Sequence, residues 1–502
     1  MLFNSQEFVL GFLPVCLAGF FLLGRFAGRE WALRWLVAAS LFFYGWWAPR
    51  FVPLLAGSIG ANYLLGGRIR AMIQAGRRRA ARRWLICGIA VDLGLLGWFK
   101  YAGFLASALN DLPGIGLPVP RPFLPLAISF FTFQQIMFLV DLYRDGQGRD
   151  GQGRDGRAPV RLLPYACFVG FFPHLIAGPI VRPREIMPQF THPGVALPQA
   201  ENLTDGMTLF LLGLAKKLVL ADMFARFADV GFGAAASGET LSLIEAWYAA
   251  LAYALQIYFD FSGYSDMAIG LARMFNIRFP LNFNSPYKSA DIAEFWRRWH
   301  ITLSGFLRDY LYIPLGGNRR GALRQRANLM ATMLLGGLWH GAAWNFVIWG
   351  GLHGGFLIAH RLFRRTGMRL PGVPARGLTL LAVIVAWVPF RADGLDATMA
   401  MLRGMAGLNG IALPQMIVGA FPALAWLAEP VPVLRFLGDA RTLSFPEVSA
   451  CLALGWGIVL FAPHVHELSA RARGWALTGG FAFTVQALFF APDVTPFLYF
   501  QF

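Results

Sequence analysis

Two histidines each stand directly after a tryptophan in the sequence. His340 stands between Trp339 and Gly341 inside an apolar run, and His300 directly follows Trp299. Imidazole is the usual general base near neutral pH, and burial favours its neutral, proton-accepting form. The glycine after His340 would let another group approach the ring closely. Both histidines are therefore candidate bases, although a histidine in an apolar helix also commonly serves as a hydrogen-bonding partner between helices.

The segment that leads to His300 has the pattern of a short amphipathic helix. Asp291 can cap its N-terminus, and Glu294 has the spacing of a capping box and of ion pairs with the arginines three and four residues later. Before it, residues 279–287 contain two prolines and two asparagines, which break a helix. Non-helical backbone at membrane depth is tolerated only where protein or a water-filled cavity supports it. We therefore expect a helix in the membrane plane, with His300 lining a cavity or packed against its neighbours.

A basic loop follows this segment at residues 316–326 and includes Arg319 and Arg320. Guanidinium groups bind phosphate with directed hydrogen bonds, so the loop could hold an anionic donor such as the phosphates of coenzyme A. Charge that only fixes the orientation of the chain in a membrane is the simpler interpretation. The sequence leaves both open.

The composition places these candidates in a membrane protein. Of the 502 residues, 57% are apolar and 14% are charged, whereas soluble proteins carry roughly 25% charged residues. The formal charge of +17 arises from basic residues in short loops between apolar runs. This distribution indicates orientation in a membrane rather than nucleic-acid binding. The sequence contains no zinc-binding spacing, so we expect no metal site.

A helix that crosses a bilayer needs about 20 mostly apolar residues. Apolar segments that could contribute to such helices recur along the chain. Several are short, so we expect about ten to twelve spans together with re-entrant or interfacial helices. The candidates are residues 8–23, 33–47, 51–65, 84–105, 123–140, 162–176, 208–220, 241–261, 329–347, 348–363, 378–390, 416–427, 448–461 and 475–490. The arginine-rich loop 67–83 is expected to lie on the cytoplasmic side of the membrane. Counting spans from it places Met1 outside and loops 24–34 and 143–161 inside.

We expect a single integral membrane domain over residues 1–502. Its parts are N-terminal helices over residues 1–280, a core with the candidate residues over 281–360, and closing helices over 361–502. A tandem Arg-Asp-Gly-Gln-Gly repeat at residues 144–153 predicts a flexible linker. Residues 258–266 form a hydroxyl- and carboxylate-rich stretch that ends a long apolar run.

Several motifs resemble the membrane-bound O-acyltransferase superfamily. They are Phe-Asn-Ser-Pro-Tyr-Lys-Ser at 283–289, Glu-Phe-Trp-Arg-Arg-Trp-His-Ile-Thr-Leu-Ser at 294–304, Arg-Asp-Tyr-Leu-Tyr-Ile-Pro-Leu-Gly-Gly at 308–317, Gly-Leu-Trp-His-Gly at 337–341 and Trp-Gly-Gly-Leu-His-Gly at 349–354. Within the superfamily the sequence is similar to the bacterial alginate O-acetyltransferase branch, which is related to the teichoic acid D-alanyl transferase. Residues 2–8, 44–47 and 173–180 also look like this branch. The resemblance covers about residues 1–400.

The resemblance implies an all-α polytopic membrane protein, with a ring of helices around a central funnel and tunnel. It also implies that His340 is the catalytic residue and that His300 is a second tunnel residue. An acetyl group from a cytoplasmic thioester, with acetyl-CoA as the expected donor and no bound cofactor, would cross to the outer face. Periplasmic acetyltransferase partners would then place it on an exopolysaccharide such as alginate. The bacterial inner membrane is the expected location, and a polysaccharide synthase or secretion complex could be a further partner.

The reaction implied by this resemblance needs a base for the attacking hydroxyl and a donor for the developing oxyanion. His340 can supply the base, and Asn345, His300 or a backbone N–H could supply the donor. No cysteine or serine lies beside His340, so we expect direct transfer rather than a covalent acyl-enzyme. The other candidates for lining the path are Trp299, Ser304, Asp309, Tyr310, Trp339 and His353. For His353, seven residues before His360, packing between helices is the simpler role.

Two other functions compete with this one. A transporter or flippase would use the polar residues as a path and would show broken helices in two repeated halves, which the sequence does not reveal. In a non-catalytic assembly subunit of a secretion machine, His340 would have only a structural role. For an acetyltransferase, the acceptor could be alginate, cellulose or another cell-envelope polymer.

Overall fold

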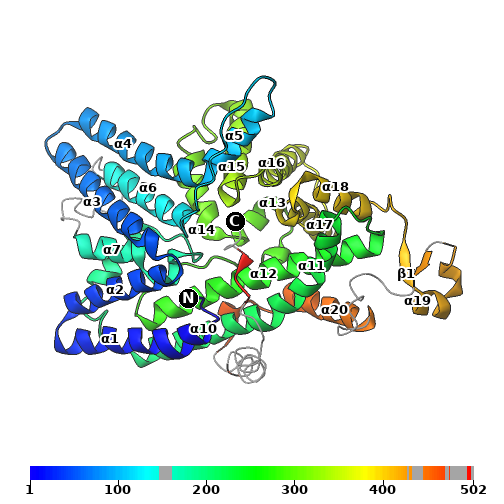
Figure 1. Ribbon diagram of the computed structural model, residues 1–502, viewed down its shortest axis with the longest axis horizontal. Coiled ribbons are helices and arrows are strands. Elements are labelled where there is room, and N and C mark those ends of the chain that lie inside the picture. Colours follow the sequence, from blue (N-terminus) through cyan, green and yellow to red (C-terminus); the bar gives the residue numbers. More distant parts are fainter. Residues whose placement is uncertain (146–160, 427–428, 432–444, 470–473, 475–494, 499–502) are drawn as a thin grey trace. The chain divides into compact units, whose positions relative to one another are not determined.

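The computed structural model of the protein describes residues 1–145, 161–426, 429–431, 445–469, 474 and 495–498 (Figure 1). The chain is helical and forms two compact units. Unit 1 comprises residues 1–213, 264–281 and 488–496, and unit 2 comprises residues 214–263, 282–487 and 497–502. Of the expected linker at residues 144–153, only residues 144 and 145 are among the described residues. The expected span at residues 475–490 lies outside them.

Unit 1 is built from the N-terminal helices. They are α1 (Leu13–Phe26), α2 (Arg29–Trp47), α3 (Val52–Gln74), α4 (Arg78–Leu96), α5 (Ala102–Asn110), α6 (Ile128–Asp145), α7 (Leu162–Gly170), α8 (Phe172–Leu175), α9 (Pro183–Thr191) and most of α10 (Ala200–Ala215). α1 packs on α2, α7 packs on α2 and α9, and α3, α4 and α6 lie side by side (Figure 1). The expected loop over residues 67–83 is mostly helical, because α3 continues to Gln74 and α4 begins at Arg78.

Close packing in unit 1 depends on small residues and on internal polar pairs. A Cβ atom at Gly19 of α1 would lie 2.5 Å from the indole of Trp35 on α2, so only glycine lets these helices approach. Asn62 of α3 donates a 2.8 Å hydrogen bond to Asp92 of α4, and both side chains are buried. Since lipid offers no hydrogen bonds, such polar groups are paired within the protein.

Unit 2 contains the residues that the sequence analysis singled out. Its helices are α11 (Asp222–Ala236), residues 243–263 of α12 (Leu243–Met274), α13 (Ile292–Arg298), α14 (Ile301–Phe306), α15 (Gly321–His340), α16 (Trp344–Arg365), α17 (Gly372–Arg391), α18 (Gly394–Met405), α19 (Gln415–Ala420) and α20 (Phe445–Phe461). α15 packs on α16, α16 on α17, and α18 on both α17 and α11. The strands β1 (Ala412–Pro414) and β2 (Glu429–Val431) pair in parallel, with Ala412 opposite Glu429.

Three helical segments in the described chain are long and apolar enough to cross a membrane. They are residues 7–26, 78–110 and 372–391. Other expected spans differ from the structure in length. The segment expected over residues 162–176 is split into the short helices α7 and α8, and that over 416–427 keeps only the short α19.

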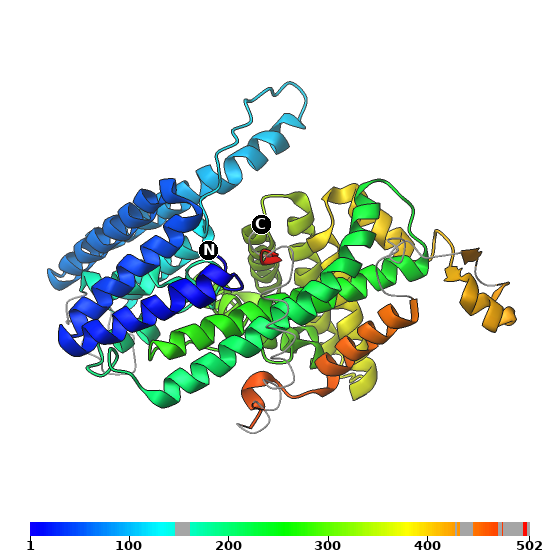
Figure 2. The ribbon, with the colours of Figure 1, turned by 60° about the horizontal axis from the view of Figure 1, so that its bottom comes forward.

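The apolar segment expected over residues 241–261 runs into the polar stretch at 258–266, and the helix does not end there. α12 continues through this stretch to Met274 as one helix of 32 residues (Figure 2). Buried partners explain the difference. In unit 2, Asp260 of α12 forms an ion pair of 2.8 Å with Lys217. A charged side chain that is paired inside the protein does not end a helix, although it lowers the hydropathy of the segment.

Candidate active site

The α15–α16 hairpin of unit 2 places His340 at the end of a helix. The expected helix over residues 329–347 instead ends at His340, and α16 begins at Trp344. Glycines let the two helices meet at their backbones. A Cβ at Gly337 would lie 2.2 Å from the Phe346 carbonyl oxygen, and one at Gly350 would lie 2.3 Å from the Met333 carbonyl oxygen. Only residues without a Cβ fit at these contacts.

The imidazole of His340 is buried among aromatic rings. Its side chain is 4% exposed, and its ring centroid lies 4.9 Å from that of Trp339, 5.1 Å from Trp349 and 5.2 Å from Phe390. A close approach does occur at Gly341, but to the glycine rather than to the His340 ring. The group that approaches is the ring of Phe346, which would lie 2.1 Å from a Cβ at Gly341.

His300 lies at the junction of α13 and α14, two helices too short to span a membrane. Its backbone is left-handed, with φ 42° and ψ 54°, and its side chain is fully buried. This conformation costs a non-glycine residue roughly 1–3 kcal/mol and persists only where the surroundings enforce it. Strained backbone of this kind is common at functional sites.

The helix that leads to His300 is fixed at its N-terminus, as expected. Asp291 accepts a 2.7 Å hydrogen bond from the backbone N–H of Glu294. Glu294 reaches back to the N–H of Ala290 at 2.8 Å, one residue earlier than in a standard capping box, and pairs with Arg298 at 2.9 Å. The carboxylates of Asp291 and Glu294 thus accept backbone N–H groups at the start of α13 and stabilise the helix.

Asn282 fixes the orientation of the His300 ring. Its side-chain oxygen Oδ1 lies 3.0 Å from His300 Nδ1 and accepts hydrogen bonds from the N–H and the hydroxyl of Thr302 at 3.3 and 2.8 Å. A backbone N–H can only donate, so the atom facing it is the amide oxygen. Nδ1 of His300 is therefore the donor to Asn282. In the neutral ring Nε2 then carries the lone pair.

Burial also sets the charge of His300. Removal of the ring from solvent lowers its pKa to about 3, because the charged imidazolium is poorly solvated there. The ring is consequently neutral at physiological pH. A neutral imidazole with Nδ1–H donated to an amide is a proton acceptor at Nε2.

The two histidines are neighbours in space although 40 positions separate them in the sequence. Their ring centroids lie 6.4 Å apart, and the ring of Phe261 packs edge-on against His300 at 4.7 Å. At this separation both imidazoles can contact the same small group. The structure thus brings two potential acid–base groups together in one buried site.

Other expected site residues take part in contacts nearby. Asn345 donates one of its two amide hydrogens to the carbonyl of Ala392 at 3.0 Å. Ser304 Oγ lies 3.4 Å from the Trp299 carbonyl. Asp309 forms a two-pronged ion pair with Arg308, with N–O distances of 2.6 and 3.0 Å. The ring of Tyr310 stacks on Phe306 at 5.3 Å.

His353 lies in an aromatic enclosure next to this pair. Its fully buried ring stacks on Phe295 at 6.1 Å and meets Trp349 edge-on at 4.8 Å. Within the described residues, neither ring nitrogen of His353 has a hydrogen-bond partner, and neither has Nε1 of Trp349. Trp299 belongs to the same layer, since its ring stacks on Phe295 at 5.7 Å. Ring N–H groups facing aromatic rings form weak contacts, which fits packing for His353.

Arg319 and Arg320 lie in an exposed turn before α15. The expected basic loop 316–326 is shorter in the structure, because α15 already begins at Gly321. The carbonyl of Gly317 accepts a 3.2 Å hydrogen bond from Asn328 of α15, which anchors the turn. Both side chains are exposed to solvent.

The sequence analysis missed two anchoring residues in unit 2. Asn282 was noted only as a helix breaker, although an asparagine next to a proline-rich break is a signal for a fixed loop. Lys217 was not noted; it is 3% exposed and lies 2.8 Å from both Asp222 and Asp260. A lysine inside an apolar segment needs such partners, and this requirement was the available signal.

The chain is similar to several known proteins. The model of the MBOAT (membrane-bound O-acyltransferase) family matches residues 151–387. The chain is 46% identical to the peptidoglycan O-acetyltransferase of Helicobacter pylori over 82% of this chain and 81% of that protein. It is 40% identical to a probable alginate O-acetylase of Azotobacter vinelandii over the full length of both. It is 27% identical to the teichoic acid D-alanyltransferase of Bacillus subtilis over 52% of this chain and 65% of that protein.

The chain belongs to the membrane-bound O-acyltransferase family. It is therefore a membrane acyltransferase, and an enzyme is favoured over a transporter or an assembly subunit. His300 and His340 both lie within the stretch that the family model matches. Among the residues that the structure describes, no group of three metal-ligating side chains occurs.

Proposed function

We propose that this enzyme moves an acetyl group from a cytoplasmic thioester across the membrane to periplasmic partner proteins, which place it on hydroxyl groups of a polysaccharide in the cell envelope. The observation that carries the proposal is the buried pair of imidazoles, 6.4 Å apart, in an acyltransferase. The names of its relatives support the substrates, since one is an alginate O-acetylase and another a peptidoglycan O-acetyltransferase.

In this proposal His340 is the general base. Its ring accepts the proton of the acceptor hydroxyl while the hydroxyl oxygen attacks the thioester carbonyl. The tetrahedral intermediate then collapses, the carbon–sulfur bond breaks, and the thiolate recovers the proton from the imidazolium. Acid–base catalysis of this kind contributes about 10²–10⁴-fold to a rate. Transfer is direct, without a covalent acyl-enzyme.

His300 holds the acceptor hydroxyl before the attack in this mechanism, and the single proton of that hydroxyl then passes to His340. Because its Nδ1–H is donated to Asn282, its Nε2 accepts a hydrogen bond rather than donating one. This polarity suits an attacking hydroxyl and does not suit an oxyanion. The oxyanion donor is then a backbone N–H or the second amide hydrogen of Asn345. Trp299, Trp339, Ser304, Asp309, Tyr310 and His353 are proposed to line or support the path.

The wider topology is part of the same proposal. The long helices outside the three most apolar segments would also cross the inner membrane, giving about ten to twelve spans around a funnel and tunnel. Acetyl-CoA would bind from the cytoplasm with Arg319 and Arg320 on its phosphates. The N-terminus would lie outside, where periplasmic acetyltransferases accept the acetyl group. The exposure of Arg319 and Arg320 in an anchored turn supports binding of the donor phosphates by these two residues.

Peptidoglycan is the second candidate for the final acceptor. The relative named for peptidoglycan is 46% identical to this chain, compared with 40–44% for four of the relatives named for alginate. Both acceptors present sugar hydroxyls outside the membrane, so the chemistry at His340 is the same for each.

The test is to delete the gene and to measure the acetyl esters of each purified polymer by mass spectrometry. The proposal expects one polymer to lose its O-acetyl groups and to regain them when the gene is restored. Unchanged acetylation of every envelope polymer would contradict it. Loss from peptidoglycan with an unchanged exopolysaccharide would select the second acceptor.

A further inference from the structure

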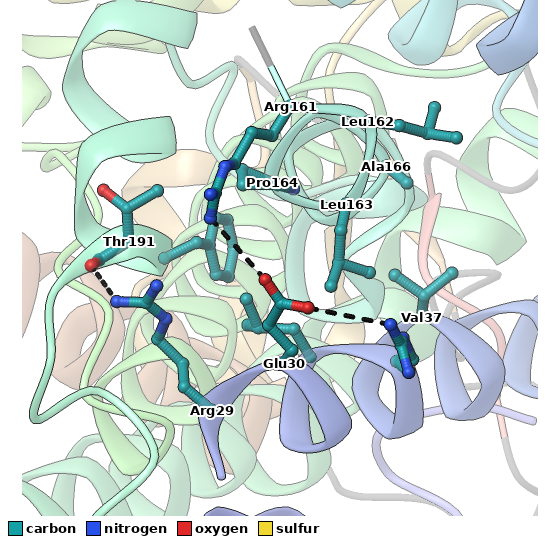
Figure 3. Close-up of a pocket in the computed structure, with 12 residues that line it drawn as sticks. Arg29, Glu30, Val37, Arg161, Leu162, Leu163, Pro164, Ala166 and Thr191 are labelled. Atoms are coloured by element: carbon teal, nitrogen blue, oxygen red, sulfur yellow. Dashed lines mark hydrogen bonds and ion pairs between the residues drawn. The ribbon is translucent and has the colours of Figure 1, made fainter. Parts of the chain in front are cut away.

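A pocket in unit 1 lies away from the two histidines in sequence and takes no part in the proposed chemistry. It is lined by residues of α2, by the start of α7 and by the end of α9, and it has a volume of about 440 Å³ (Figure 3). Its size is that of a small-molecule site.

The rim of the pocket is basic. Arg29, Arg34 and Arg161 line it together with one carboxylate, Glu30, which leaves a formal excess of two positive charges. Glu30 pairs with Arg34 and Arg161 at 3.6 Å each, and Arg29 donates to the carbonyl of Thr191 (Figure 3). Each guanidinium has five N–H donors, so these contacts leave donors for an anion.

The floor of the pocket is apolar. Leu33 and Val37 of α2 and Leu163, Ala166 and Phe190 line it as well, and each of them is more buried than Arg34 and Arg161. Leu162, which also lines the pocket, is 49% exposed, so the apolar surface continues outward. A ligand that matches both parts carries a negative head and an apolar chain.

Trp31 places this pocket at the headgroup level of a bilayer. Its side chain is 53% exposed on α2, and the guanidinium of Arg34 lies 4.6 Å above its ring. Exposed tryptophans and arginines mark the membrane–water interface. Both loops that supply the arginines are expected on the cytoplasmic side, where anionic lipids collect. The Arg161–Glu30 ion pair joins these two loops, which agrees with one common face.

We propose that this pocket binds an anionic glycerophospholipid. The phosphate of the headgroup contacts Arg34 and Arg161, and the start of an acyl chain follows Val37, Leu162 and Ala166. A soluble phosphate compound shares the headgroup chemistry but leaves the apolar floor uncovered. The lipid would tie α2 to α7 and α9 at one membrane face.

The test measures thermal unfolding of the full-length protein in detergent during titration with phosphatidylglycerol. Phosphatidylethanolamine and glycerol 3-phosphate serve as separate titrants. We expect phosphatidylglycerol to raise the melting temperature at concentrations where the other two do not. In the double variant Arg34→Gln and Arg161→Gln, the apparent affinity for phosphatidylglycerol should fall about fivefold for each arginine removed. Ala166→Phe fills the floor and should weaken it with every charge in place.

Two further variants control for folding and for charge. Arg25→Gln removes one positive charge from α1 outside the pocket and should leave the response unchanged. Glu30→Gln removes the competing carboxylate and should strengthen the response, which a folding defect cannot do. An equal response to phosphatidylethanolamine, or an unchanged response in the arginine and Ala166 variants, would overturn the proposal. An equal response to glycerol 3-phosphate would identify a soluble anion as the occupant and would also overturn it.

Discussion

His300 donates a hydrogen bond from Nδ1 to the side-chain oxygen of Asn282 at 3.0 Å. The same oxygen accepts both the N–H and the hydroxyl of Thr302. One amide thus fixes the tautomer of a buried imidazole and holds the start of α14. The chemical consequence is that Nε2 is the proton-accepting atom of His300.

Replacing this amide with a carboxylate should make the enzyme sensitive to pH. In Asn282→Asp the acceptor atom remains, but its negative charge favours the imidazolium and raises the pKa of His300 from about 3. Protonated His300 has no lone pair, so acetyl transfer in isolated membranes should fall as the pH is lowered from about 8 to about 5. The natural enzyme should lose less over this range. Identical pH profiles would contradict the assigned tautomer.

The left-handed backbone at His300 can be separated from the role of its ring. Asparagine tolerates this conformation well, so His300→Asn should fold with a melting temperature close to that of the natural enzyme. It lacks the imidazole and should lose acetyl transfer by about tenfold or more. His300→Ala tests the conformation, because alanine tolerates it poorly. Full activity in His300→Asn would exclude a role of the ring in the reaction.

The contact between Gly341 and Phe346 holds the end of α15. In Gly341→Ala the new methyl group would meet the Phe346 ring, and such overpacking costs typically about 1–3 kcal/mol. We expect lower thermal stability and weaker acetylation, with partial recovery in the double variant Gly341→Ala and Phe346→Leu. Gly355→Ala is the matched control, since a Cβ there meets nothing within 4 Å. Equal effects of the two alanines would contradict the packing account.

The ion pairs of Lys217 should contribute to the stability of unit 2. Lys217→Met leaves the carboxylates of Asp222 and Asp260 without their shared cation, and breaking a buried pair in this way costs about 3–5 kcal/mol. Lys216→Met is the control, because it removes the same charge from the neighbouring residue and leaves the two ion pairs of Lys217 in place. A clear drop in melting temperature is expected for Lys217→Met alone. Similar melting temperatures for both variants would show that the pairs are not stabilising.

The sequence predicted the helical membrane fold and the two histidines because both depend on local pattern. Apolar runs and the motifs around His300 and His340 are visible without coordinates. Their approach to 6.4 Å is not visible, since it depends on the packing of α13–α16. The break after His340 was also missed, because the residues on both sides of it are apolar.

Internal polar pairs account for the other differences. α12 continues beyond the expected segment 241–261 although polar residues follow it, and Lys217, the partner of Asp260, lies 43 positions earlier in the chain. Asn282 likewise looked like a helix breaker, and its bond to His300 appears only in three dimensions. Long-range partners of this kind cannot be identified from one sequence.

Replacement of His340 tests the central claim most directly. His340→Ala and the exposed His192→Ala control are each expressed in the deletion strain, and the polymer acetyl content is measured alongside the amount of protein in the membrane. The account predicts that His340→Ala lowers acetylation by about a hundredfold or more at normal protein level, because the general base is lost. His192→Ala should acetylate normally. Normal acetylation in His340→Ala would contradict the account.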